Sequence, residues 1–148
     1  MKRVPLDICT GCAACLVSCV HNAIEMVADH EGFLYPQIDD SKCTQCGNCT
    51  QVCPVESDSI VPNDATNSTV YAGWAKDREV LLQSTSGGIF SEIAFKILDA
   101  GGVVFGAAYD DAMTVKHIAV EDREGLAALR GSKYVQSDVN DTYRQVSK

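Results

Sequence analysis

Eight cysteines fall in two runs that share the same spacing. The first run is Cys9, Cys12, Cys15 and Cys19, and the second is Cys43, Cys46, Cys49 and Cys53. Both runs read C-x2-C-x2-C-x3-C, the offset between corresponding cysteines is constant, and no cysteine is left over. This spacing is typical of thiolates that hold iron–sulfur clusters, so the fold has to be built around two metal centres.

The two runs resemble those of bacterial-type ferredoxins, which hold two cubane [4Fe–4S] clusters. In that pattern a short loop wraps three cysteines around one cubane. The fourth cysteine begins a short helix that leads away, and it therefore ligates the other cubane. The pattern assigns Cys9, Cys12, Cys15 and Cys53 to a first cluster and Cys19, Cys43, Cys46 and Cys49 to a second. A protein of this kind stores electrons and passes them one at a time.

Two other uses of the cysteines are weaker. Structural zinc prefers two C-x2-C pairs that together form one tetrahedron, which would leave the third and fourth cysteine of each run unexplained. Disulfides require an oxidising compartment. The chain begins with Met1, Lys2 and Arg3, and no apolar stretch of a signal peptide follows. Iron–sulfur ligation is the interpretation that uses all eight thiols.

The runs differ after the fourth cysteine. Pro54 follows Cys53, whereas Val20 follows Cys19 and restores a backbone N–H that can point at sulfur. Such N–H groups tune cluster potential, so we expect the two potentials to differ. His21 is interpreted as a surface histidine beside the cluster, because the cysteines already complete the ligand set.

Between the runs, residues 23–27 and 33–38 read as short strands around a polar turn that contains Gly32. Their apolar side chains are expected to cover the clusters and keep water away. The expected cover is Ile24, Met26, Phe33, Tyr35 and Ile38. Residues 1–58 are too few to fold without the metal, because so short a segment needs metal-binding energy to stabilise it.

The net charge is −8, of which −5 lies in residues 1–58, where eight Asp and Glu face three Lys and Arg. An acidic surface disfavours nucleic acid and anionic membranes, and it favours a redox partner with a basic docking patch. No apolar stretch has the length of a transmembrane helix. We therefore expect a soluble, cytoplasmic protein.

Composition changes beyond a linker at residues 59–69, which is rich in turn-forming residues. Residues 70–75 read as a strand, residues 86–98 as a helix that ends at Gly101 and Gly102, and residues 103–109 and 114–120 as two strands starting a hairpin. Short helices are expected over 123–129 and from Asp138 onward. The sequence predicts an α+β ferredoxin-like two-cluster domain over 1–58 and a partial α/β domain over 70–148, with helices covering a sheet.

Two segments of the second domain are candidates for ligand binding. Ser86, Gly87 and Gly88 lie at a helix N-terminus, where free N–H groups favour anions. The alternative is that Ser86 caps the helix and the glycines only make the turn. Gly131, Ser132 and Lys133 offer a turn, a hydroxyl and a cation, an arrangement that is also common at ordinary surfaces.

Three stretches resemble the coenzyme F(420) hydrogenase/dehydrogenase beta-subunit family. They are Ser84–Phe90, Val103–Tyr109 and the run from Gly131 through Ser132, Lys133 and Tyr134 to Ser137. That family joins ferredoxin-type clusters to a flavin-binding domain, which exchanges electrons with a deazaflavin or another partner. The resemblance implies FAD as a possible cofactor, with Ser86, Gly87, Gly88, Gly131, Ser132, Lys133 and Tyr134 as its contacts.

Members of this family continue beyond the position of Lys148, and the chain stops as a helix begins. We expect a truncated product, a fragment or one half of a split protein, which would associate with a missing C-terminal half. The main prediction is an iron–sulfur electron-transfer protein. The alternatives are a complete small flavin-dependent oxidoreductase that works as an oligomer and a non-redox adaptor with structural clusters. A hydrolase is disfavoured, since no G-x-S-x-G motif or spare cysteine is present.

Overall fold

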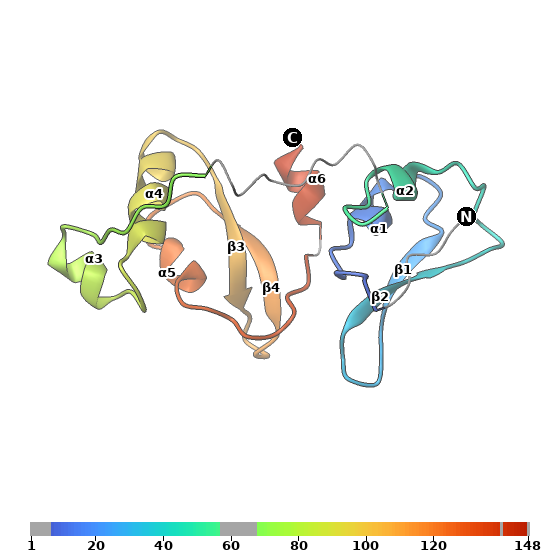
Figure 1. Ribbon diagram of the computed structural model, residues 1–148, viewed down its shortest axis with the longest axis horizontal. Helices are drawn as coiled ribbons and strands as arrows, with labels where there is room; N and C mark the ends of the chain where they lie inside the picture. The colour runs from blue at the N-terminus through green and yellow to red at the C-terminus, as the bar shows by residue number, and fades with distance from the viewer. Residues whose placement is uncertain (1–6, 57–67, 140, 148) are drawn as a thin grey trace. The chain divides into compact units, whose positions relative to one another are not determined.

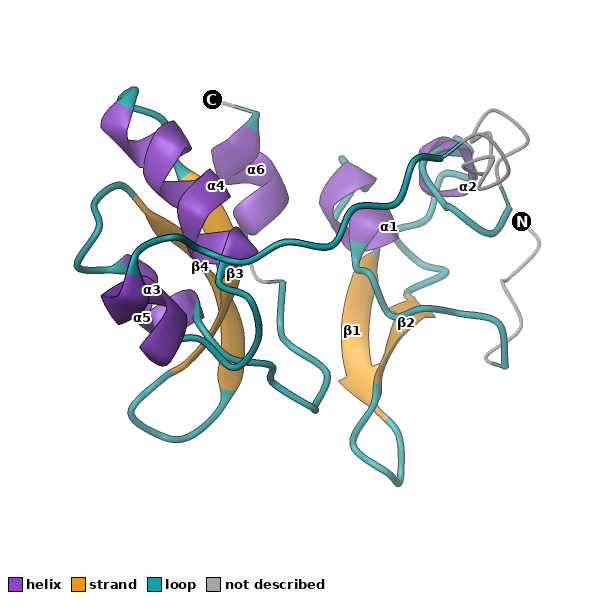
Figure 2. Cartoon of the chain, turned by 60° about the vertical axis from the view of Figure 1, so that its left-hand side comes forward, coloured by secondary structure: helices purple, strands orange, loops and turns teal. Residues whose placement is uncertain are grey.

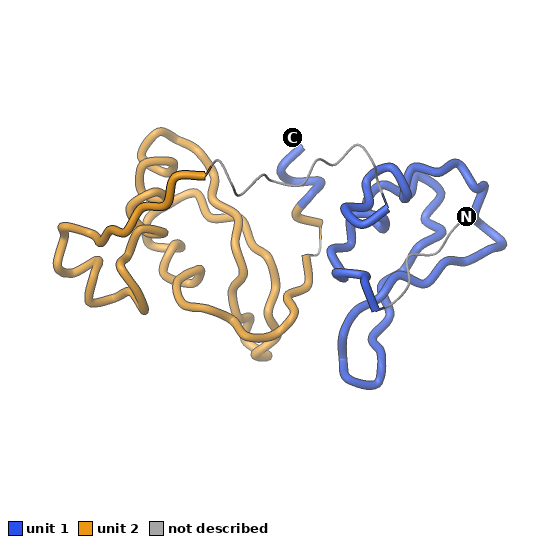
Figure 3. Tube along the Cα trace, in the orientation of Figure 1, with its two compact units in different colours: residues 1–65, 143–148 blue, residues 66–142 orange. Residues whose placement is uncertain are grey.

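The computed structural model describes residues 7–56, 68–139 and 141–147. The chain divides into two compact units, residues 1–65 together with 143–148, and residues 66–142 (Figure 3). Most of the linker expected at 59–69 lies outside the described residues. Each unit is described by itself.

The first unit is an antiparallel hairpin accompanied by two very short helices (Figure 1). Its elements are α1 (Ala14–Ser18), β1 (Ile24–Ala28), β2 (Leu34–Ile38) and α2 (Asn48–Gln51). The ladder runs from Ile24 opposite Ile38 to Ala28 opposite Leu34, which confirms the predicted hairpin. Buried apolar side chains are few in the described part of this unit: Ala13, Ala23 and Ile24.

The helices of the first unit lie before the fourth cysteine of each run, not after it as the sequence suggested. Helix α1 ends at Ser18 with Cys19 as its C-terminal cap, and α2 ends at Gln51, shortly before Cys53. The fourth cysteine therefore leaves a helix instead of beginning one.

The second unit is a two-stranded antiparallel sheet with helices packed on it (Figure 2). Its elements are α3 (Arg78–Leu82), α4 (Ile89–Asp99), β3 (Val104–Tyr109), β4 (Val115–Val120) and α5 (Leu126–Leu129). Helix α6 (Thr142–Val146) follows, and its residues from Tyr143 onward belong to the first unit. The described chain is thus a mixed α/β protein with two small antiparallel sheets.

The core of the second unit joins α4 and α5 to the hairpin. It contains Ala94, Leu98, Val104, Ala108, Val120, Leu126 and Leu129. Helix α4 ends as predicted: Gly101 has a φ of 78°, and the N–H of Gly102 donates to the carbonyl of Ile97 at 2.9 Å.

The face of α4 that packs on the core differs from the apolar face given by helical periodicity. That apolar face consists of Phe90, Ile93, Ala94, Ile97 and Leu98. Of these, only Ala94 and Leu98 are buried, and Ser91 joins them on the buried side. Phe90, Ile93 and Ile97 are exposed, whereas the Ser91 hydroxyl accepts a hydrogen bond from Arg130.

Three other expectations on the second unit are wrong in detail. Residues 70–75 form no strand. A hydrogen bond from the N–H of Ala75 to the carbonyl of Gly87, at 2.6 Å, fixes the end of this segment. The helix expected over 123–129 is shorter: it consists of α5 alone, because residues 122–125 form a bend and a turn. The last helix begins at Thr142 instead of Asp138, because Asp138 pairs beside β4 in a bridge with Lys116.

Within the described parts of the chain, every helix is too short or too polar to span a lipid bilayer.

Candidate metal centre

The two cysteine runs have left-handed residues at the same two positions. Gly11 and Gln45, which occupy the same position in the two runs, both have positive φ values, 63° and 57°. Ala13 and Gly47 also correspond to each other; they have φ values of 59° and 82° and immediately precede α1 and α2. Two left-handed residues in each run bend the loop around its cysteines.

Four cysteines surround the larger cavity of the first unit. Cys9, Cys12 and Cys15 come from the first run, and Cys53 comes from the second. The cavity has a volume of about 550 Å³, and Cys49 also reaches its wall. Apolar side chains of the hairpin line the rest, namely Ile24, Met26, Val27, Tyr35 and Ile38. Four thiols and an apolar wall are the donor set and surroundings that a [4Fe–4S] cluster needs, so this site fits the group.

Phe33, a residue of the expected cover, does not line the cavity. It is 47% exposed and lies at the hairpin turn. The other four residues of the expected cover, Ile24, Met26, Tyr35 and Ile38, line it.

The remaining cysteines line a second, much smaller cavity of about 20 Å³. Its wall holds Cys19 from the first run with Cys43, Cys46 and Cys49 from the second. This donor set also suits a [4Fe–4S] cluster. The space is small, however, so these side chains have to move outward to accommodate a cubane. His21 borders the same cavity and is exposed.

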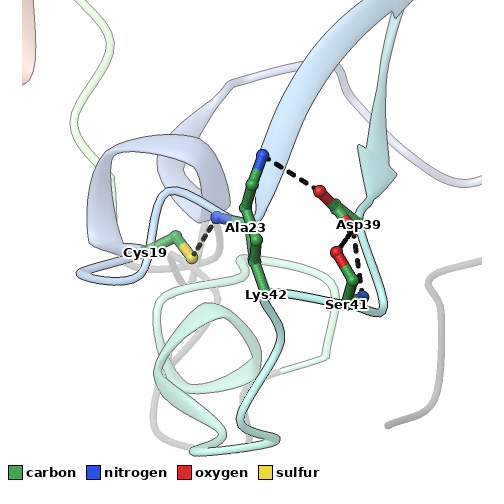
Figure 4. Close-up of polar contacts among 5 residues, drawn as sticks. All are labelled: Cys19, Ala23, Asp39, Ser41 and Lys42. Atoms are coloured by element: carbon green, nitrogen blue, oxygen red, sulfur yellow. Dashed lines mark hydrogen bonds and ion pairs between the residues drawn. The ribbon is translucent and has the colours of Figure 1, made fainter.

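The hairpin links Cys19 to Cys43 within this second set, and Figure 4 shows Cys19, Ala23 and Asp39 of this linkage. The N–H of Ala23 donates to the Cys19 sulfur at 3.3 Å, and the carbonyl of Ala23 accepts from the N–H of Asp39 at 2.8 Å. The carbonyl of Asp39 then accepts from the N–H of Cys43 at 3.0 Å. The sequence suggested an N–H from Val20 at this sulfur; the described donor is Ala23.

Asp39 organises the turn that leads into the second run. Its carboxylate accepts from the N–H and the hydroxyl of Ser41, at 3.0 and 2.5 Å, and pairs with the ammonium group of Lys42 at 3.0 Å (Figure 4). The bonds from Ser41, followed by the one from Lys42, lower the pKa of Asp39 to about 2. The turn is therefore fixed by a charged carboxylate at neutral pH.

The thiols differ in their exposure. Burial raises the pKa of Cys15 to about 11, so iron has to displace a firmly held proton there. Cys46 is exposed, whereas the other seven cysteines are half-buried. Among the described residues, no three His, Cys, Asp or Glu side chains converge tightly enough for a single metal ion.

Tyr143 in α6 contacts the first cysteine loop. Its hydroxyl donates to the carbonyl of Cys12 at 3.1 Å. Burial, with a smaller contribution from Cys12, raises the pKa of Tyr143, so the hydroxyl keeps its proton and stays a donor at neutral pH. No sequence signal indicates this contact, since the two residues are 131 positions apart.

The second unit brings part of the predicted flavin contacts together. Ser86, Gly87, Gly88 and Gly131 line one cavity of about 210 Å³, together with Arg130. Gly88, not Ser86, caps α4; it has a φ of 77° and makes no side-chain capping bond. Ligand pockets usually span roughly 300–1,000 Å³, so this cavity has room for a phosphate-sized group and not for a whole flavin.

The other predicted flavin contacts lie elsewhere. The ammonium group of Lys133 donates to the carbonyls of Ala128 and Arg130, at 2.9 and 2.8 Å, and so closes the end of α5. Tyr134 is 92% exposed, and Ser132 is exposed. Neither these two residues nor Lys133 line the cavity.

Sequence reasoning missed Arg130 as a residue of that cavity. Its guanidinium donates to the buried hydroxyl of Ser91 at 3.1 Å and to the side chain of Gln83. It also lies 5.9 Å from the ring centre of Phe95. A single arginine after a short helix carries no recognisable motif, so only the fold reveals it.

Comparisons with known proteins match different parts of the chain to different families. Sequence models of a 4Fe-4S dicluster domain match residues 8–57 and residues 35–88. Over 54 residues the chain is 37% identical to a subunit of the Na(+)-translocating ferredoxin:NAD(+) oxidoreductase complex of Acetobacterium woodii. That match covers 36% of this chain and 15% of the relative.

The other half of the chain matches a different model. Residues 70–143 match the model described as coenzyme F420 hydrogenase/dehydrogenase, beta subunit N-term. An iron–sulfur dicluster segment therefore precedes this segment in one chain. The chain belongs to the coenzyme F420 hydrogenase/dehydrogenase beta-subunit family.

Proposed function

We propose that this protein carries two [4Fe–4S] clusters and passes single electrons to or from a flavin- or deazaflavin-type oxidoreductase. One observation carries the proposal: the wall of each of two cavities contains three cysteines of one run and the fourth cysteine of the other, with Cys49 bordering both cavities. The dicluster match over residues 8–57 supports the same chemistry.

The proposed ligands are Cys9, Cys12, Cys15 and Cys53 for the first cluster and Cys19, Cys43, Cys46 and Cys49 for the second. A bound cluster supplies a site that accepts and releases one electron. The chain holds the metal through thiolates and limits water through the hairpin side chains Met26 and Tyr35. It also directs the N–H of Ala23 at one sulfur.

We further propose a functional division into a cluster domain at 1–58, a linker at 59–69 and a flavoprotein-like segment at 70–148. The cavity at Ser86–Gly88 and Gly131 is suited to one phosphate group of FAD. Because the cavity is too small for the whole cofactor, the binding site for the flavin ring would be supplied by a missing C-terminal half or by the redox partner. The −5 charge of residues 1–58 favours a basic patch on that partner.

The first experiment is to purify the full chain without oxygen and to measure iron, sulfide, zinc and flavin per polypeptide. About eight iron and eight sulfide per chain, the content of two cubanes, support the proposal. Reduction by dithionite, followed by electron paramagnetic resonance, then tests whether the clusters take up electrons. Zinc without sulfide, or clusters that resist reduction, would contradict it. Flavin retained after removal of iron would favour an enzyme that is complete as an oligomer.

A pair of single-cysteine variants tests the crosswise ligation. Cys53→Ser is expected to remove the signal of the first cluster, as Cys15→Ser does, even though the two residues belong to different runs. Cys19→Ser is expected to act like Cys46→Ser on the second cluster. If Cys53→Ser instead has the same effect as Cys46→Ser, each run holds its own cluster and the crosswise assignment is wrong.

A further inference from the structure

The C-terminal helix makes a side-chain hydrogen bond to the first cysteine run. Tyr143 belongs to the first unit, although residues 66–142 of the other unit separate it from the cluster segment (Figure 3). Its hydroxyl donates to the backbone carbonyl of Cys12, the middle ligand of the first loop. A contact across 131 residues is not a by-product of local geometry.

The equivalent position in the second run is Cys46, which is the second cysteine of its run as Cys12 is of the first. Each loop has left-handed residues at the same two positions, so the two loops can be compared position by position. Cys46 is exposed, while Cys12 is half-buried. The two loops therefore differ in how their second cysteine is covered.

We propose that Tyr143 is a positioning residue that closes the loop of the first cluster and leaves the second cluster as the solvent-facing one. This inference rests on the proposed function, since it requires both clusters to be present. The phenol ring covers the loop only in part, because Tyr143 itself is 42% exposed. Its effect therefore comes chiefly from the hydrogen bond, which holds the peptide after Cys12 in place.

The loop that Tyr143 holds contains backbone strain that favours opening. Ala13 follows Cys12 directly and has a φ of 59°, which L-residues with a Cβ atom rarely adopt. A hydrogen bond on the carbonyl between these two residues opposes relaxation of that strained conformation. Opening of the loop admits water and oxidants to the first cluster, and greater solvent exposure also raises its potential.

The test compares the loaded wild-type chain with Tyr143→Phe, which keeps the ring and removes only the hydroxyl. Tyr134→Phe is the matched control, because Tyr134 is 92% exposed and lies in the other unit. Cys12→Ser and Cys46→Ser identify which spectroscopic signal belongs to which cluster. Loss of each cluster is followed after a measured dose of oxygen, and both midpoint potentials are measured by redox titration.

We expect Tyr143→Phe to lose the first cluster about 2- to 13-fold faster, the factor that corresponds to the roughly 0.5–1.5 kcal/mol of one hydrogen bond. The midpoint potential of the first cluster should rise, while the second cluster and the Tyr134→Phe control stay unchanged. A purely structural role would lower iron content before the challenge without moving either potential. That result, or equal behaviour of both clusters, would overturn the inference.

The same experiment separates this inference from the proposed function. A wild-type chain without cluster iron and sulfide would overturn both. Two intact clusters that respond identically in wild type and Tyr143→Phe would overturn the role of Tyr143 alone.

Discussion

Several aspartates of this chain organise turns through the backbone N–H two residues later. Asp29 accepts from the N–H of Glu31 at 2.9 Å, Asp39 from that of Ser41 at 3.0 Å, and Asp110 from that of Ala112 at 3.0 Å. These contacts satisfy backbone donors that a turn would otherwise leave to solvent. The pKa values of Asp39 and Asp110 are lowered, so protonation in acid weakens these two turns.

Asp110 gives a pH prediction in the second unit, away from the acid-labile clusters. Lys116, at 2.7 Å, and then the backbone N–H of Thr114 lower the pKa of Asp110 below its ordinary value of 3.8. A lowered carboxyl pKa contributes stability above the unfolded pKa, and this contribution is lost as the pH falls through the folded pKa. Asp110→Asn should therefore be less stable than wild type at pH 6, and the difference should shrink below about pH 3.8.

The measurement is the urea midpoint of the second unit, followed through amide protection of β3 and β4 at pH 6 and pH 3. The control is Asp111→Asn, because Asp111 is the neighbouring exposed carboxylate. A stability difference between Asp110→Asn and wild type that is constant over this range would contradict the role of the charged form.

At the scale of elements, the two hairpins of the chain share one turn design. Asp29 and Asp110 each begin a turn, and the fourth residue of each turn has a positive φ: 90° at Gly32 and 60° at Met113. Glycine adopts this conformation freely, whereas methionine does so at a cost of about 1–2 kcal/mol. The second hairpin therefore contains strain that the first lacks.

Met113→Gly should stabilise the second unit by about 0.5–1 kcal/mol, because relief of the strain outweighs the extra chain entropy of glycine. Met113 is 72% exposed, so little packing is lost. Thermal or urea unfolding of the second unit measures the gain. Met113→Ala is the control, since alanine keeps the Cβ atom and the strain. Equal stability of both variants would show that the φ value is not the cause.

The loop before α4 depends on a glycine for a different reason. A Cβ atom on Gly87 would lie 2.5 Å from the carbonyl oxygen of Gly73 and 3.3 Å from the Cα of Trp74, both backbone atoms. Gly87→Ala should therefore destabilise the second unit by about 1–3 kcal/mol, the usual cost of overpacking. Gly73→Ala is the matched control, because its Cβ would meet Ile89 at an ordinary 3.5 Å. Urea midpoints compare the two, and an equal loss would place the cause outside this clash.

At the scale of the whole molecule, the two units rely on different sources of stability. The described part of the first unit buries three apolar side chains, and that of the second buries ten. A unit with so small a core folds only with the binding energy of its metal. The second unit has a core of its own between α4, α5 and the β3–β4 hairpin.

Removal of iron with a chelator under reducing conditions should therefore unfold the first unit alone. Hydrogen exchange followed by mass spectrometry is expected to show loss of protection in β1 and β2 and retained protection in β3 and β4. Protection of β1 and β2 that persists without iron would show that the hairpin does not need the clusters.

Sequence reasoning succeeded where the signal is local. The hairpin at 23–38, the stop of α4 at Gly101 and strands β3 and β4 follow from alternation and glycine chemistry within a few residues. The apolar face of α4 did not by itself indicate its buried face, since only Ala94 and Leu98 of its apolar residues reach the core. Ser91 lies on the buried side through its partner Arg130, 39 residues away.

At the candidate site, too, sequence reasoning worked for local patterns and failed for contacts between distant residues. The cavity walls place Cys53 with the first run and Cys19 with the second, as the spacing suggests, but Cys49 borders both cavities. Which four thiols hold each cluster stays a prediction. The contact of Tyr143 with Cys12 and the entry of Arg130 into the second unit's cavity depend on long-range packing. The strand predicted at residues 70–75 is absent, because a local sequence pattern does not distinguish an exposed extended segment from a strand that pairs with a neighbour.

The β1–β2 hairpin has a consequence for the order in which the metal is acquired. Cys19 and Cys43 lie just outside its two ends, and hydrogen bonds through Ala23 and Asp39 fasten each of them to the ladder. A hairpin forms in microseconds, so each transient closure of this ladder brings the two thiols together before the unit is stabilised by iron. The larger cavity has its four proposed ligands only when Cys53, late in the cluster segment, lies beside Cys9, Cys12 and Cys15. Iron delivery should thus begin at the site of Cys19 and Cys43, and the other centre matures second.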